Sequence, residues 1–224
     1  MKTVHRPTAA LLLAAALILG GCKTMPPPTP PPPRPVVEVA ELPAWYPIAS
    51  AEDMQRLERL DDAWREALAE VRSRGSVRAV DAEGVLLRPT AGLPRPAPTP
   101  GPYSCRMIKL GTQTGRGTPF NAYKPFACYV EVENDLLTIV KQTGSQRPAG
   151  RLYADTNANR LIFLGTLALG TEDAPLPYGE RADRDMAGIM ERIGPFRFRL
   201  VVPWPRTDSK LDVIELVPVI EKAE

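Results

Sequence analysis

A polar segment, residues 143–148, carries the side chains of this chain best suited to binding a small ligand. Ser145 supplies a hydroxyl, Gln146 an amide and Arg147 a guanidinium, and Pro148 restricts the backbone at the end of the segment. Such groups can bind a carboxylate, a sugar or the backbone of a partner protein. The alternative is a structural loop whose side chains cap its own backbone. Ser145, Gln146 and Arg147 are therefore candidate binding residues, and Arg147 is the strongest of them if it lies in the mouth of a barrel.

Two other pairs of residues have the types needed for catalysis, but each has a simpler interpretation. Glu131 and Glu133 share one face of a predicted strand. Two carboxylates can act as acid and base in glycoside cleavage, although same-face glutamates are typical of a solvated strand face. Lys141 could deprotonate Ser145 if burial lowered its pKa, but no feature of the sequence favours this dyad.

Further charged pairs lie later in the chain. Asp183 and Asp185 are expected at the start of a helix, where their charges suit the helix dipole. Arg197 and Arg199 share a strand face and could contact an anion, although a solvated face is the simpler interpretation.

The chain has a single histidine, His5, which lies in a segment assigned below to an export signal. Without it the chain has no imidazole, which excludes Ser-His-Asp and Cys-His catalysis, histidine-ligated zinc and histidine pH switches. The glycine-rich motifs that bind phosphates or dinucleotides are also absent. We therefore expect no cofactor and no metal, and we identify no catalytic residue. Whether the protein is an enzyme stays open, with binding favoured over catalysis.

Residues 1–22 have the order of an export signal. Two basic residues precede the apolar run 9–19, which is followed by small residues and Cys22. This order resembles the lipobox of bacterial lipoproteins, and the resemblance implies that Cys22 becomes the first mature residue and carries lipid, including palmitate. The run is shorter than the roughly 20 residues of a membrane span, which leaves a transmembrane anchor or an ordinary cleaved signal as alternatives. Lys23 in place of aspartate favours the periplasmic face of a Gram-negative outer membrane.

The sequence divides into a signal, a tether, one globular domain and a tail. Removal of 21 of the 224 residues leaves 203, which suits one domain of moderate size. The tether is rich in proline, so it predicts a stiff polyproline II spacer. The predicted bounds are signal peptide 1–21, lipidated cysteine and tether 22–43, globular domain 44–218 with a helical part 44–92 and a β part 101–218, and tail 219–224.

Cys105 and Cys128 are the two cysteines that remain once Cys22 is assigned to lipid. A lone pair of cysteines in an oxidising compartment forms a disulfide by default. The bond would close a loop of about 23 residues, for which the chain-entropy model gives about 3 kcal/mol. The pair lacks the Cys-x-x-Cys spacing typical of a redox site.

The helical part begins at Ser50, a suitable N-cap, and ends near Gly75. Apolar residues between them recur at steps of three and four, which predicts one amphipathic helix. A short second helix near residues 77–87 is also possible. These apolar residues are Leu57, Leu60, Trp64, Leu68 and Val71.

From residue 103 the apolar period changes to two, which predicts short strands with one buried face. Residues 183–193 interrupt this pattern with helical spacing, from Met186 to Ile193. The pattern predicts an α+β, mainly β fold. We expect a small antiparallel β-barrel of seven or eight strands, preceded by an N-terminal helix and with one short helix inserted late. The expected strands are 103–110, 126–133, 136–142, 150–154, 161–169, 196–202 and 210–217.

Several segments resemble an uncharacterised group of bacterial envelope proteins, the family domain of unknown function 4893. The resemblance covers roughly residues 44–218 and implies a domain boundary and an exported setting, with no known activity or catalytic residue. The segments that carry it are 101–111, 143–148, 163–167, 191–195 and 211–218, together with the helix around 57–64.

These observations favour a periplasm-facing outer-membrane lipoprotein that acts as a non-enzymatic binding module. It would hold a small ligand inside the barrel or an envelope protein on its rim. The alternatives are an inhibitor or assembly factor that acts on another envelope protein through its loops, and a hydrolase that uses carboxylates or lysine. Without the signal, 26 basic residues balance 26 acidic ones, so the basic footprint of a nucleic-acid binder is absent.

Overall fold

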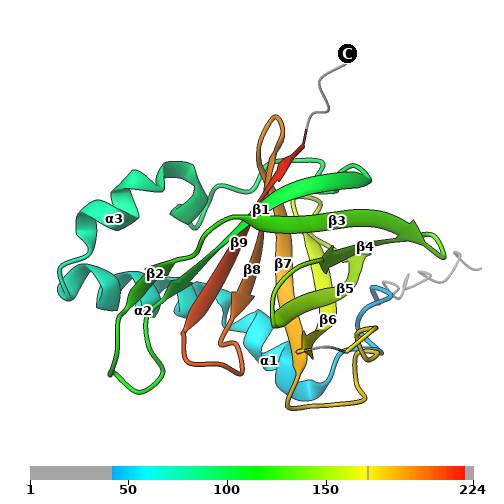
Figure 1. The fold of residues 1–224 in the computed structure, drawn as a ribbon, viewed down its shortest axis with the longest axis horizontal. Helices are drawn as coiled ribbons and strands as arrows, with labels where there is room; N and C mark the ends of the chain where they lie inside the picture. Colours follow the sequence, from blue (N-terminus) through cyan, green and yellow to red (C-terminus); the bar gives the residue numbers. More distant parts are fainter. Residues whose placement is uncertain (1–41, 171, 220–224) are drawn as a thin grey trace, which may run out of the picture. The chain divides into compact units, whose positions relative to one another are not determined.

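The computed structural model describes residues 42–170 and 172–219, which form an antiparallel β-barrel with helices packed on its outer surface (Figure 1). The predicted mainly β barrel with a preceding helix is confirmed. Cys22, the expected signal and tether, and most of the tail lie outside the described residues. Within the described ranges, no helix has both the length and the apolar character that a membrane span requires.

The predicted helix 50–75 forms as two helices with a break at Arg59. Helix α1 spans Ala51–Glu58 and α2 spans Leu60–Ser73. Ser50 caps α1, because its hydroxyl accepts a hydrogen bond from the Asp53 backbone N–H at 3.1 Å. A third helix, α3 (Val77–Ala82), and a 3₁₀ helix, η1 (Gly84–Leu87), follow.

Eight strands follow one another round the barrel in chain order, and the first closes it against the last. Eight residue pairs join β1 to β9, from Tyr103 opposite Pro218 to Leu110 opposite Leu211. The short β2 pairs with the end of β1 and adds a ninth strand at this seam. The strands are β1 (Gly101–Leu110), β2 (Phe120–Ala122), β3 (Phe126–Glu133), β4 (Leu136–Lys141), β5 (Gln146–Ala154), β6 (Leu161–Leu169), β7 (Asp185–Gly194), β8 (Arg197–Pro203) and β9 (Leu211–Pro218).

The two faces of the strands pack into separate cores. Alternate residues such as Cys105, Val130 and Leu200 fill the inside of the barrel. The opposite face of β1, β8 and β9 is buried under α2, α3 and η1, and that of β6 and β7 is buried under α1. The cysteines of β1 and β3 both face the interior, and the predicted Cys105–Cys128 disulfide is confirmed, with Cα atoms 5.9 Å apart.

The expected late helix over 183–193 is wrong, because this segment forms strand β7 between β6 and β8. Met186 and Met190 face the barrel interior, and Ala187 and Ile189 pack under the outer helices. A strand buried on both faces is apolar on both, so it lacks the alternation that identifies a half-buried strand.

The expectation that Arg199 lies on a solvated strand face is also wrong. Its side chain is fully buried between β8 and the helical layer. Its guanidinium donates hydrogen bonds to the carbonyl oxygens of Leu86, Arg88 and Pro89 and meets Glu191 at 2.7 Å. These carbonyls end the helical segment, so one side chain of the barrel satisfies them together.

Candidate functional site

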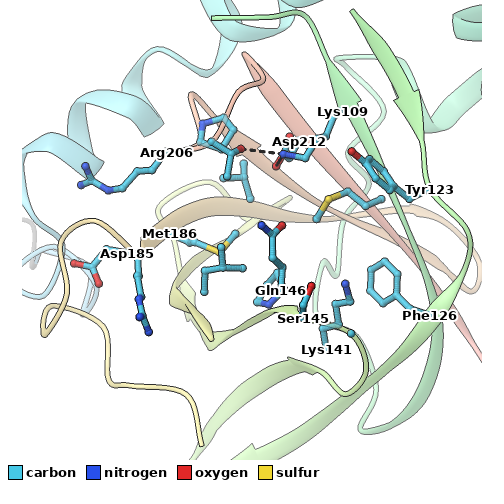
Figure 2. A pocket seen from close by; sticks show the side chains of 18 of the residues that line it. Lys109, Tyr123, Phe126, Lys141, Ser145, Gln146, Asp185, Met186, Arg206 and Asp212 are labelled. Carbon is cyan, nitrogen blue, oxygen red and sulfur yellow. Dashed lines mark hydrogen bonds and ion pairs between the residues drawn. The ribbon is translucent and has the colours of Figure 1, made fainter. Parts of the chain in front are cut away.

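A cavity of about 530 Å³ occupies one end of the barrel interior (Figure 2). Each of the eight barrel strands contributes at least one interior-facing residue to its wall. The remainder of the wall comes from α1 and from the loops at this end. One wall residue per barrel strand, in chain order, is Met107, Phe126, Lys141, Gln146, Leu167, Met186, Val202 and Asp212.

The rest of the barrel interior is filled by side chains, so the cavity ends inside the barrel. Gly150 on β5 lies opposite Gly165 on β6, and the Phe163 ring occupies the space beside both glycines. A Cβ atom at Gly165 would lie 2.5 Å from that ring. The rings of Tyr103 and Phe198 also fill part of the barrel interior, where they meet edge to face at 6.3 Å between centroids.

One part of the cavity wall carries a buried ion pair between β1 and β9. The Lys109 ammonium lies 3.5 Å from the Asp212 carboxylate and 3.1 Å from that of Asp208, and it donates to the Thr207 hydroxyl at 2.9 Å. Burial alone lowers the pKa of Lys109, but the two carboxylates outweigh this effect and raise it. Lys109 is therefore charged and already held by its own partners.

The part of the wall beside α1 is a second, fully paired cluster. Arg56 lies 2.9 Å from the Asp53 carboxylate, and Arg206 binds both oxygens of Glu52 at 3.0 Å. The Tyr178 hydroxyl donates to Asp53 at 2.6 Å, and its burial together with this hydrogen bond raises the pKa of Tyr178 to about 12. This cluster fixes the loop before β7 to the start of α1.

The loop between β6 and β7 and the start of β7 supply three more charged residues of the wall. Asp183 lies in this loop and pairs with Arg181 at 3.0 Å, and Arg184 pairs with Glu172. Asp185 begins β7, and burial raises its pKa. The expectation that Asp183 and Asp185 start a helix is therefore wrong, since both precede or begin a strand.

Lys141 differs from these cations because it has no carboxylate partner within the described residues. Its ammonium lies 4.3 Å from the centroid of the Phe126 ring, and burial lowers the pKa of Lys141 with no opposing charge effect. Ser145 and Gln146 stand beside it on the same β4–β5 hairpin (Figure 2). No hydrogen bond joins either side chain to the other residues drawn in the figure.

The structure separates the three binding candidates of the sequence. Ser145 and Gln146 line the cavity, whereas Arg147 does not. Arg147 donates to the carbonyl oxygens of Gly144 and Gly170, and also to that of Glu172. Its guanidinium therefore orders the rim loops, as in the structural alternative.

The structure places the two pairs of catalytic candidates differently. Glu131 and Glu133 are exposed, and Glu133 pairs with Arg151 at 3.2 Å, as expected of a solvated face. Lys141 and Ser145 both line the cavity. Sequence reasoning considered Lys141 only as a base, although the alternation of β4 places it on the same face as Leu137 and Ile139, which face the interior.

Among residues 42–170 and 172–219, no three histidine, cysteine or acidic side chains gather in a way that could hold a metal ion. The model of one protein family, Domain of unknown function (DUF4893), matches residues 45–216, so the chain belongs to this family as the resemblance indicated. No curated protein matches the chain, and no solved structure does.

Proposed function

We propose that this DUF4893 protein is a non-enzymatic binding module that holds a small, largely apolar ligand inside its barrel. The observation that carries the proposal is the cavity of about 530 Å³ at the barrel end. Its volume lies within the roughly 300–1,000 Å³ range of small-molecule sites. Its wall combines apolar side chains, among them Met107, Leu167 and Met186, with polar and charged ones, most of which are already held by partners within the protein. Apolar surface with specific polar groups is typical of small-molecule sites.

The charged residues of the wall support binding over catalysis. Lys109 and Asp212 hold each other, and Arg56 and Arg206 are paired with acidic residues of α1. A hydrolase based on lysine or carboxylates needs an ionisable group free to exchange a proton with the substrate. Lys141 and Asp185 have no ion-pair partner among the described residues, but Figure 2 shows them on opposite sides of the cavity, so they do not converge on one point as a catalytic pair would.

We also propose that the protein is attached by lipid at Cys22 to the periplasmic face of the outer membrane. The sequence order around Cys22 supports this location. The Cys105–Cys128 bond adds support, because disulfides persist in oxidising compartments. Cys22→Ser should abolish acyl labelling and release the protein from membranes. Unchanged membrane retention would contradict the proposal.

Native mass spectrometry of the exported Cys22→Ser chain tests the binding function. We expect an additional mass that dissociates on activation. Leu167→Trp, which adds bulk inside the cavity, should remove it, while Val132→Trp, at an exposed position of β3 outside the cavity wall, should not. A bare mass for the Cys22→Ser chain, or an additional mass that survives Leu167→Trp, would overturn the proposal.

A further inference from the structure

We propose that the ligand is an amphipathic monoanion whose carboxylate-like head group is bound by Lys141 together with Ser145 and Gln146. This inference rests on the proposed binding function and assigns the chemical class of the ligand. The apolar part of the ligand would lie against Met107 and Met186 in the same cavity.

The first argument is the charge balance of the cavity wall. Four of its cations already have carboxylate partners in the described structure. Lys141 has only the Phe126 ring and is half-buried. A partly desolvated ammonium without a counter-ion is unfavourable, so an anion bound beside it gains more than the same anion would gain in water. The four paired cations are Arg56, Lys109, Arg184 and Arg206.

The second argument is the set of donors around Lys141. The Ser145 hydroxyl and the Gln146 amide project into the cavity from the β5 end of the hairpin, beside the Lys141 side chain from β4 (Figure 2). One ammonium and two neutral donors can satisfy the two oxygens of a carboxylate. A dianionic phosphate would require a second free cation beside Lys141. Arg147 is occupied by the rim carbonyls, and Lys124, the other wall lysine without a described carboxylate partner, is exposed on the rim.

The third argument is the contrast between the polar group formed by Lys141, Ser145 and Gln146 and the apolar residues of the same cavity wall. The wall also contains four apolar side chains without a hydrogen-bond donor, whose only acceptors are the weak sulfur atoms of methionine: Met107, Leu167, Met186 and Val202. A ligand that satisfies Lys141 and also buries apolar surface must therefore carry its charge at one end. Medium-chain carboxylates have this shape and charge.

The test compares three probes of equal chain length by isothermal titration calorimetry on the Cys22→Ser chain, after any copurifying ligand has been stripped on a hydrophobic resin. The probes are decanoate, decanol and decylammonium. Decanoate should bind most tightly and decylammonium most weakly. Lys141→Met should weaken decanoate binding by about ten- to a hundredfold, the loss expected for one charge-assisted hydrogen bond, and leave decanol binding nearly unchanged.

Two further variants separate a local contact from a general charge effect and from misfolding. Lys141→Arg keeps the charge and should retain most of the decanoate affinity, which shows that the site still folds. Lys124→Met removes an equal charge from the exposed rim and should change the affinity little.

Equal loss in Lys124→Met and Lys141→Met, or no loss in Lys141→Met, would overturn the head-group assignment. Decanol that binds as tightly as decanoate would overturn the anionic class while the proposed binding function stands. Failure of all three probes would also overturn this inference, and the native mass spectrum would then decide the binding function on its own.

Discussion

Replacement of Arg199 by methionine should destabilise the domain by several kcal/mol. Its side chain has no exposed surface, and it donates to the carbonyl oxygens of Leu86 and Arg88 at 2.8 Å and of Pro89 at 3.0 Å. It also meets the Glu191 carboxylate at 2.7 Å. Methionine fills part of the same space without a donor, so four acceptors lose their partner together.

The expected loss of unfolding free energy in Arg199→Met follows from the broken ion pair with Glu191 and from the three carbonyl oxygens left without a donor. Removal of one partner of a buried ion pair costs about 3–5 kcal/mol, because the remaining charge stays buried. Glu191 is 14% exposed, so water compensates part of this cost, while the three carbonyls add to it. We therefore expect a loss of about 4 kcal/mol, which lowers Tm by roughly 8–16 °C in a domain of this size.

Urea unfolding followed by circular dichroism measures this loss. The slope of the unfolding free energy against urea should stay constant, so that the shift in midpoint reports stability alone. The double variant Arg199→Met/Glu191→Gln should recover part of the lost stability, since it removes the carboxylate charge that Arg199→Met leaves unpaired.

Arg151→Met is the matched control. It breaks an exposed pair with Glu133, in which the two side chains are 44% and 53% exposed, and should cost at most about 1 kcal/mol. If Arg199→Met cost no more than this control, the view that Arg199 fastens the helical layer to the barrel would be wrong.

Two further predictions concern Glu70 and the disulfide. Burial raises the pKa of Glu70, but hydrogen bonds from the Thr112 N–H and hydroxyl outweigh it and lower the pKa to about 2 from its usual 4.5. Its stabilising contribution is therefore complete above about pH 4.5 and lost as the pH falls towards 2, so Glu70→Gln should flatten the acid side of the stability profile measured by urea unfolding. Replacing Cys105 and Cys128 together by alanine should lower the unfolding free energy by about 3 kcal/mol, and an unchanged urea midpoint would contradict this.

The barrel was predictable because its most regular strands keep polar residues on one face. In β3, Cys128 and Val130 point inward between Tyr129 and Glu131, which are exposed. A period of two over such a segment has no helical interpretation. The disulfide was predictable for a different reason, since assigning Cys22 to lipid leaves only Cys105 and Cys128 to pair.

The same reasoning failed at β7 because helices cover the outer face of this strand, so that face is apolar instead of polar. Ala187 and Ile189 lie under α1 while Met186 and Met190 lie inside the barrel, so the segment is apolar in either register. Its apolar residues then fit a helical period as well as a strand. Arg199 was missed for a related reason, because a charged side chain on a strand predicts solvent unless the acceptors that bury it are known.

The position of Lys141 in the cavity could be derived from the sequence, but its lack of a partner could not. Alternation along β4 places Leu137, Ile139 and Lys141 on one face, and the structure shows that this face lines the barrel interior. Which acidic residues reach a given lysine depends on the closure of the barrel. Lys109 finds Asp212 because β1 pairs with β9 across the seam, a contact between strands about a hundred residues apart.

Uneven filling of the barrel explains why the cavity lies at one end. Phe163, Tyr103 and Phe198 fill the interior away from the cavity, and interior positions at the open end carry Lys141 and Gln146 instead. Apolar residues there would bury more surface and pack the barrel completely, which would increase its stability. Lys141 has no carboxylate partner among the described residues, which lowers stability, and the anion proposed above would supply that partner.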